Sequence, residues 1–193
     1  MHRFLETASL YLRRLIPEDA PLLAALDSDP AVMQFISKGE ATPLENIEAV
    51  ILPRLLSYYT VSETVGFWAA HTRAPDTFVG WFHLRPDRFS PDEMELGYRL
   101  KRAVWGRGYA TEMSRALIDR GFTAWEYDRI IARALVGNAA SRRVMEKCGL
   151  RQEGFFTYPA DLLPGWTEAE RSAVKYGLDR AQYLTSMVLP TQE

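Results

Sequence analysis

Three expected β-strands follow one another in the middle of the chain with no room for a helix between them. The segments are GFWAAHTR (66–73), TFVGWFHLR (77–85) and EMELGYRL (93–100). The first two are rich in aromatic and β-branched residues, and the third alternates apolar with polar residues, as strands do. The short APD between the first two predicts a hairpin turn. A parallel Rossmann-type sheet alternates strands and helices throughout, so this meander predicts antiparallel pairing instead.

The flanking segments complete a mixed pattern of strands and helices. Apolar periodicity, N-cap residues and prolines predict helices over 17–30, 42–59, 111–124 and 138–150. Further strands are expected over 9–16, 129–137, 151–159 and 172–180. Pro53 should kink or split the second helix near its middle. The expected fold class is α+β, with a mixed, mostly antiparallel sheet of about six to seven strands and helices on both faces.

Composition narrows the functional classes. The 193 residues, 47% of them hydrophobic and 25% charged, predict a single domain over 1–193 with its core at about 9–185. A net charge of −2 and a pI of about 6.0 argue against a large nucleic-acid-binding face. The single cysteine, Cys148, excludes a disulfide framework. No signal peptide and no membrane-spanning apolar run is visible, so a cytoplasmic protein with no membrane partner is expected.

The stretch VWGRGYATE (104–112) places a glycine turn between a predicted strand and a predicted helix. Backbone N–H groups at a helix N-terminus have no intrahelical partner and attract anions. Gly106 and Gly108 would let the backbone approach an anion without a Cβ in the way, and Arg107 would add positive charge. The turn therefore predicts a phosphate or pyrophosphate site.

Several interpretations of this turn compete. A Walker A loop needs a lysine after its last glycine, and none follows Gly108. A dinucleotide fingerprint needs a third glycine where Thr111 stands. An acyl-coenzyme A pyrophosphate loop opens a helix after a long strand, and Trp105, Gly108 and Ala110 occupy its three pattern positions. A tight turn that binds nothing remains open on the loop alone.

A second segment, NAASRRVMEKCGL (138–150), helps to decide between these interpretations of the turn. Together with LYLRRLIPEDA (10–20) and WGRGYATE (105–112), in this order, it resembles the GNAT superfamily of N-acetyltransferases, in particular its RimJ/RimL-like branch. The resemblance covers about residues 9–185. It implies a GNAT fold, acetyl-CoA as co-substrate and no metal, and it allows a homodimer, since family members are often dimers.

The resemblance also implies where acetyl-CoA binds. The strands over 93–100 and 129–135 would splay apart and admit the pantetheine arm, with the backbones of Leu100 and Arg102 as its partners. The N–H groups of the loop would bind the pyrophosphate, and Asn138 would touch pantetheine while capping its helix. The loop residues are Arg107, Gly108, Tyr109, Ala110 and Thr111. The chain departs from the superfamily at Trp105, where Arg or Gln is usual, and at Met145, where many members place a tyrosine general acid.

Acetyl transfer needs a neutral amine, a stabilised oxyanion and a proton for the leaving thiolate. Glu95 is the expected general base, with Glu93 as a weaker rival, and the alternative role for Glu95 is a surface glutamate or an ion pair with Arg99. By resemblance Ser141 lies near the sulfur and hydrogen-bonds the thiolate; the alternative is a capping or core-facing serine. Cys148 is expected to be a small buried hydrophobic residue, not a nucleophile.

The acceptor is a primary amine that the sequence does not identify, either a protein N-terminus or a small molecule. By resemblance, Phe35, Tyr158 and Trp166 border its cleft. His2, His71 and His83 show no metal-ligand spacing. We expect direct transfer in a ternary complex. The alternative to an enzyme is a coenzyme A-binding sensor or regulatory module without turnover.

Overall fold

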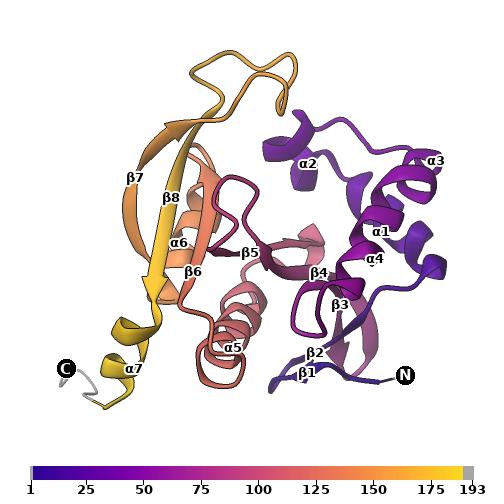
Figure 1. Ribbon diagram of the computed structural model, residues 1–193. Helices are drawn as coiled ribbons and strands as arrows, with labels where there is room; N and C mark the ends of the chain where they lie inside the picture. Colours follow the sequence, from indigo (N-terminus) through magenta and orange to yellow (C-terminus); the bar gives the residue numbers. More distant parts are fainter. Residues whose placement is uncertain (1, 189–193) are drawn as a thin grey trace. The chain divides into compact units, whose positions relative to one another are not determined.

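A computed structural model describes residues 2–188 of the chain (Figure 1). The chain falls into two compact units, which are described in turn. Unit 1 comprises Met1–Arg85 and Gly97–Met113, and unit 2 comprises Pro86–Leu96 and Ser114–Glu193. No helix among the described residues is both long enough and apolar enough to cross a membrane.

The strands are β1 (Leu5–Glu6), β2 (Leu10–Arg14), β3 (Gly66–Arg73), β4 (Asp76–Pro86), β5 (Met94–Leu100), β6 (Arg129–Leu135), β7 (Arg151–Thr157) and β8 (Ser172–Asp179). The α-helices are α1 (Ala20–Asp27), α2 (Pro30–Ser37), α3 (Leu44–Asn46), α4 (Leu52–Ser57), α5 (Tyr109–Thr123), α6 (Ala139–Lys147) and α7 (Arg180–Val188). Strand β5 and helix α5 each begin in one unit and end in the other.

The strands pair in the order β1-β2-β3-β4-β5-β6-β8-β7. Strands β5 and β6 run parallel, whereas β1–β2, β2–β3, β3–β4, β6–β8 and β7–β8 are antiparallel. The expected mixed, mostly antiparallel α+β fold is confirmed. The expected number of strands was too low, because the two-residue β1 is too short to show an alternating pattern.

In unit 1 the helices cover one face of the meander (Figure 1). Their apolar side chains pack on β3 and β4 through Phe67, Ala69 and Phe78. The helical contribution to this core comes from Ala20, Leu23, Leu26, Val32, Ile47, Leu52 and Leu55. The strand expected over 9–16 is present as β2, but its burial does not alternate, because Tyr11 and Arg13 are buried as well as Leu10 and Leu12.

The first motif of the sequence, LYLRRLIPEDA, has a structural role in unit 1. Arg13 donates two hydrogen bonds of 2.6 Å to the two carboxylate oxygens of Asp19, and both side chains are buried. The same carboxylate accepts the backbone N–H of Ile16 at 2.9 Å. A buried ion pair is tolerated only with such good geometry and further hydrogen bonds. The motif therefore fixes the turn from β2 into the first helices.

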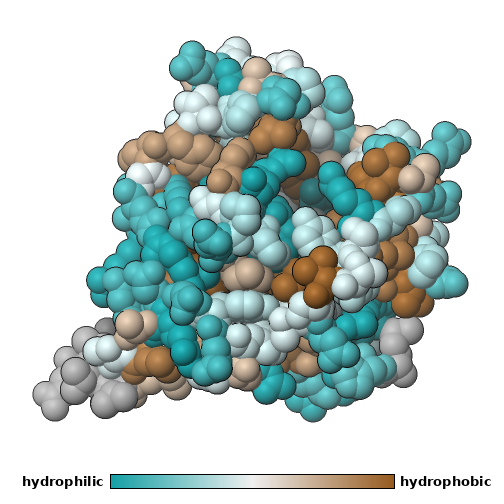
Figure 2. Space-filling model, viewed as in Figure 1, coloured by the Kyte–Doolittle hydropathy of each residue, from teal (hydrophilic) through white to brown (hydrophobic). Residues whose placement is uncertain are grey.

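Unit 2 is built on the sheet β6-β8-β7, and α6 packs against β6 and β7 (Figure 1). Alternate residues of β6 and β8 face this helical side and are buried, among them Ile130, Ala132, Val174 and Tyr176. The opposite face carries polar side chains, and Figure 2 shows hydrophilic residues over β7 and β8 at its left. One face of this sheet is therefore apolar core, and the other carries charged side chains together with the buried Ile131 and Ala173.

The segment before Pro53 is π-helical over Ile47–Ile51, which confirms the predicted distortion. The helices differ from the sequence expectation at three other places. Helix α2 was missed because Pro30 was interpreted as the end of the preceding helix. It instead opens a new one, with Asp29 as N-cap accepting the N–H of Ala31 at 2.9 Å. Helix α7 was also missed, and α5 begins at Tyr109, not at Thr111.

His83 on β4 makes the stability of the fold pH-dependent. Its ring is buried and stacks on Phe67 at 4.8 Å, and its Nδ1 has no hydrogen-bond partner among residues 2–188. Burial, aided by the positive charge of Arg85, lowers the pKa of His83 well below its ordinary value. The unfolded chain thus binds a proton near pH 6.5 that the folded chain does not bind.

The stabilisation from His83 is therefore complete above the unfolded pKa and is lost as the pH falls below it. We expect the free energy of unfolding, measured by urea titration, to fall by up to about 2 kcal/mol between pH 7 and pH 5. His83→Phe should reduce this dependence, because a similar flat ring without a titrating group takes its place. The exposed His2→Phe is the control. An unchanged slope in His83→Phe would contradict the assignment.

Candidate active site

The glycine turn opens α5 in unit 1 as expected. Gly106 has φ +76° and Gly108 has φ +83°, a left-handed backbone that favours glycine. A Cβ at either position would meet no heavy atom within 4 Å among the described residues. The first bond of the helix runs from the N–H of Glu112 to the carbonyl of Gly108 at 2.9 Å. The N–H groups of Tyr109 and Ala110 precede it, so the turn presents open space and helix-end donors together.

Positive charge flanks this turn. The side chains of Arg102 and Arg107 are exposed. Within residues 2–188 neither guanidinium has an ion-pair or hydrogen-bond partner. Unpaired guanidinium groups beside a helix N-terminus are suited to binding a phosphate or pyrophosphate.

Trp105 anchors the turn to the strand before it. Its indole N–H donates to the carbonyl of Leu100 at 2.9 Å, while half of the side chain stays exposed. Arg102 begins a short 3-10 turn, and its carbonyl accepts the backbone N–H of Trp105 at 3.1 Å. The tryptophan that replaces the usual Arg or Gln thus shapes the loop. The proposed backbone roles of Leu100 and Arg102 toward pantetheine remain predictions.

Glu112, the last residue of the WGRGYATE motif, was not singled out in the sequence. Its carboxylate accepts the backbone N–H of Ser9 at 2.7 Å, which ties the start of α5 to the start of β2. Burial tends to raise the pKa of Glu112, but hydrogen bonds from Thr7 and Ser9 outweigh it and lower the pKa. Part of the glycine motif is therefore structural.

Helix α6 in unit 2 holds the second group of expected residues. The side chain of Asn138 caps it by accepting the N–H of Ser141 at 3.1 Å, as expected. Met145, at the usual tyrosine position, is buried, and its thioether has no acidic proton to give. Cys148 is buried too, and burial raises the pKa of its thiol to about 11. This confirms a core role for the cysteine, since a nucleophilic thiol needs a lowered pKa.

Glu95 lies on the polar face of the unit 2 sheet. It pairs in register with Ile131 of β6, and Ile131 pairs with Gly177 of β8, so these three residues share a face. Side chains alternate along a strand, so Arg133 and its partner Lys175 lie on the same face. Glu95 is half-buried there. Arg99, the ion-pair partner considered in its alternative role, instead pairs with Asp27 at 2.5 Å in unit 1.

Glu93, the rival base, is held by two cations. Lys175 contacts its two carboxylate oxygens at 2.6 and 2.8 Å, and Arg129 donates to it at 2.7 Å. Burial tends to raise the pKa of Glu93, but these hydrogen bonds and charges lower it overall. A carboxylate with a lowered pKa is a weaker base, which counts against Glu93, and the role of Glu95 as the base remains a prediction.

Asp87 organises the loop between β4 and β5. It forms an ion pair with Arg133, and the two side chains are 0% and 5% exposed. Its other oxygen accepts the N–H groups of Phe89 at 3.0 Å and Ser90 at 2.8 Å. Burial tends to raise the pKa of Asp87, but the hydrogen bond from Arg133 and these backbone bonds lower it. Sequence reasoning missed this residue, because its partner is 46 positions away.

The expected acceptor residues fall in different units. Phe35 is half-buried in α2 of unit 1 and has non-helical angles there. Tyr158 and Trp166 are half-buried in the β7–β8 connection of unit 2. Tyr158 contacts Phe156 edge-on at 4.9 Å and Phe89 at 6.2 Å. Their roles toward an acceptor remain predictions. No cluster of three or more potential metal ligands occurs in the part of the chain that the structure describes.

Comparison with known proteins adds independent findings. A family model described as an acetyltransferase (GNAT) domain matches residues 9–151. The FsC-acetyl coenzyme A-N(2)-transacetylase of Aspergillus fumigatus is 33% identical over 189 residues, which cover 93% of this chain and 77% of that protein.

Two solved structures are similar in fold. One is an acetyltransferase (GNAT family) from Bacillus anthracis, with a TM-score of 0.72 at 23% identity, covering 91% of this chain and 98% of that one. The other is the spermidine N-acetyltransferase from Vibrio cholerae, with a TM-score of 0.71 at 17% identity, covering 92% and 99%. At these identities the likeness concerns the fold alone.

Proposed function

The chain belongs to the GNAT acetyltransferase family and is an acetyl-CoA-dependent N-acetyltransferase, and from this premise we propose that it acetylates a primary amine by direct transfer in a ternary complex. The observation that carries the proposal is the glycine turn. Two glycines with left-handed backbone angles open α5 and have open surroundings. Arg102 and Arg107, which have no partner among residues 2–188, flank them. Backbone donors, helix dipole and charge together fit the pyrophosphate of acetyl-CoA.

The proposed chemistry assigns one role to each residue. The neutral amine attacks the thioester carbonyl carbon, a C–N bond forms and the C–S bond breaks. Glu95 takes the proton that the amine loses, directly or through one water. Ser141 hydrogen-bonds the departing thiolate, which takes its proton from water because Met145 can supply none. No enzyme residue is acylated, in keeping with the buried Cys148.

The acceptor belongs to the amines that related enzymes use. A relative at 33% identity is named for transfer to an N(2) position, and a structural neighbour for transfer to spermidine. Both support an amine acceptor, and we propose the same class here, with Tyr158 and Trp166 at its border. We further propose that the enzyme works in the cytoplasm and without a metal ion.

The test is calorimetric titration of acetyl-CoA into the protein, followed by thiol release with pooled small amines and N-terminal peptides. Binding followed by release is expected. Binding without release from any acceptor would indicate a coenzyme A sensor instead. Absence of binding would overturn the assignment of the glycine turn as a pyrophosphate site.

Gly108→Glu should weaken acetyl-CoA binding by at least about tenfold, because its carboxylate would repel the pyrophosphate. The substitution also strains a residue with φ +83°. Gly149→Glu is the matched control, since Gly149 has φ +86° and equally open surroundings after α6. Calorimetry should find normal affinity in Gly149→Glu. Equal losses of affinity in both variants would mean that backbone strain, not anion binding, explains the effect.

A further inference from the structure

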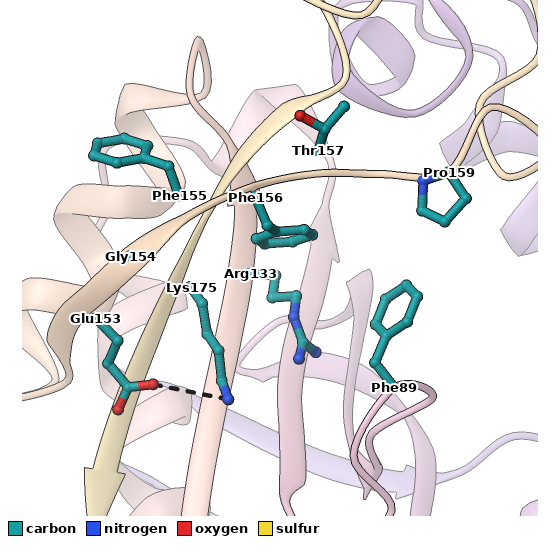
Figure 3. A pocket seen from close by; sticks show the side chains of 9 residues that line it. All are labelled: Phe89, Arg133, Glu153, Gly154, Phe155, Phe156, Thr157, Pro159 and Lys175. Atoms are coloured by element: carbon teal, nitrogen blue, oxygen red, sulfur yellow. Dashed lines mark ion pairs between the residues drawn. The ribbon is translucent and has the colours of Figure 1, made fainter.

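Unit 2 contains a cavity of about 500 Å³ on the polar face of its sheet. Its lining includes Phe89, Arg133, Glu153, Phe155, Phe156 and Lys175. Figure 3 shows Phe156 and Phe89 pointing toward Arg133, while the ring of Phe155 points away to the other side of β7. Cavities of this size commonly hold small molecules. The cavity lies on the face of the sheet that also carries Glu95.

The charges around this cavity are already paired. Arg133 is held by Asp87, and Lys175 is held by Glu93 at 2.6 Å. Glu153 forms ion pairs with Arg129 and, at 3.8 Å, with Lys175. Each of these carboxylates therefore has a cation beside it, although Glu93 and Glu153 share Arg129 and Lys175. A second ammonium group of a ligand would have to compete with one of these cations for a carboxylate.

Two aromatic rings at the cavity also contact a cation. The guanidinium of Arg133 lies 5.2 Å from the ring centre of Phe89 and 5.6 Å from that of Phe156. Tyr158 packs edge-on against Phe156 and extends this aromatic wall. The ring of Phe89 remains 44% exposed. A ligand that covered this apolar surface would gain from its removal from water.

We propose that this cavity holds the body of the acceptor and selects a monoamine with an apolar or aromatic body over a polyamine. The inference rests on the proposed function, since Glu95 would take the proton of an amine bound on this face. Phe89, Phe156 and Tyr158 bind the acceptor body. The paired charges of Arg133 and Lys175 hold these walls in place and offer no free carboxylate to a second ammonium.

The experiment compares 2-phenylethylamine with 1,4-diaminobutane by thiol release at saturating acetyl-CoA. We expect kcat/KM to be at least about tenfold higher for 2-phenylethylamine, a difference of about 1.4 kcal/mol. Phe156→Ala and Phe89→Ala should each raise its KM about tenfold, with kcat within twofold and the KM for acetyl-CoA unchanged. Leu184→Ala, at an exposed apolar residue of α7 that does not line the cavity, should leave all three constants unchanged.

Higher kcat/KM for 1,4-diaminobutane, or equal KM values in Phe156→Ala and Leu184→Ala, would overturn the inference and leave the enzyme assignment intact. If neither amine is acetylated, saturation-transfer NMR on the protein with coenzyme A decides the question. A signal from bound 2-phenylethylamine that Phe156→Ala weakens would support the inference, and the absence of a signal would overturn it. Failure of the proposed function would appear separately, as the absence of acetyl-CoA binding.

Discussion

Replacing Glu95 by glutamine is expected to lower kcat by about 10²-fold or more, because the amide cannot take a proton from the attacking amine. The affinity for acetyl-CoA should stay unchanged, since the role proposed for Glu95 concerns the amine alone. Stopped-flow thiol release measures the first quantity and calorimetry the second. The change preserves shape and removes a charge from a half-buried strand position.

The matched control is Glu48→Gln, which alters an exposed glutamate of unit 1. It should retain the kcat of the unchanged protein. A kcat within threefold of normal in Glu95→Gln would exclude Glu95 as the base. A loss of unfolding free energy in parallel with kcat would instead assign Glu95 a structural role.

Replacing Asp87 by asparagine should lower the free energy of unfolding by about 3–5 kcal/mol, because it leaves the charge of Arg133 buried without its partner. Both side chains are almost fully inaccessible to solvent. The loss would be a large part of the total stability of an ordinary domain. The loop that carries Phe89 should also become more mobile, because Asp87 accepts the N–H groups of Phe89 and Ser90 and these hydrogen bonds would weaken.

Urea unfolding followed by circular dichroism measures this effect. Asp92→Asn, an exposed acid in the same loop, should change the free energy of unfolding by less than about 0.5 kcal/mol. The double variant Asp87→Asn, Arg133→Met should recover part of the loss, because no charge then stays buried alone. A double variant no more stable than Asp87→Asn would show that the ion pair is not the cause.

The features that local sequence could predict are those that depend on near neighbours. The meander, the glycine turn, the cap by Asn138 and the distortion before Pro53 each follow from residues within a few positions of one another. Backbone preference and capping act over this range. Pro30 shows the limit, because a proline ends one helix and begins another with the same local signal.

The features that could not be predicted depend on partners from distant strands. Glu93 and Glu95 look equivalent in EMELGYRL, yet Glu93 is held by Lys175, which is 82 positions away. The sheet order that brings β5, β6 and β8 together decides this, and no local pattern encodes it. The sequence did not mark Phe89 and Phe156 as site residues for the same reason. Phe89 lies in a loop and Phe156 follows another phenylalanine, so neither belongs to a periodic pattern that would indicate a site.

The glycine turn has a consequence for how such an enzyme can diverge. Gly106 and Gly108 have left-handed angles, so any side chain at either position meets a conformational penalty. The proposed acceptor cavity is instead formed by side chains such as Phe89 and Phe156, which can be exchanged without a change in the backbone. Descendants of this chain can therefore acquire a new acceptor by point mutation while they keep the same acyl donor.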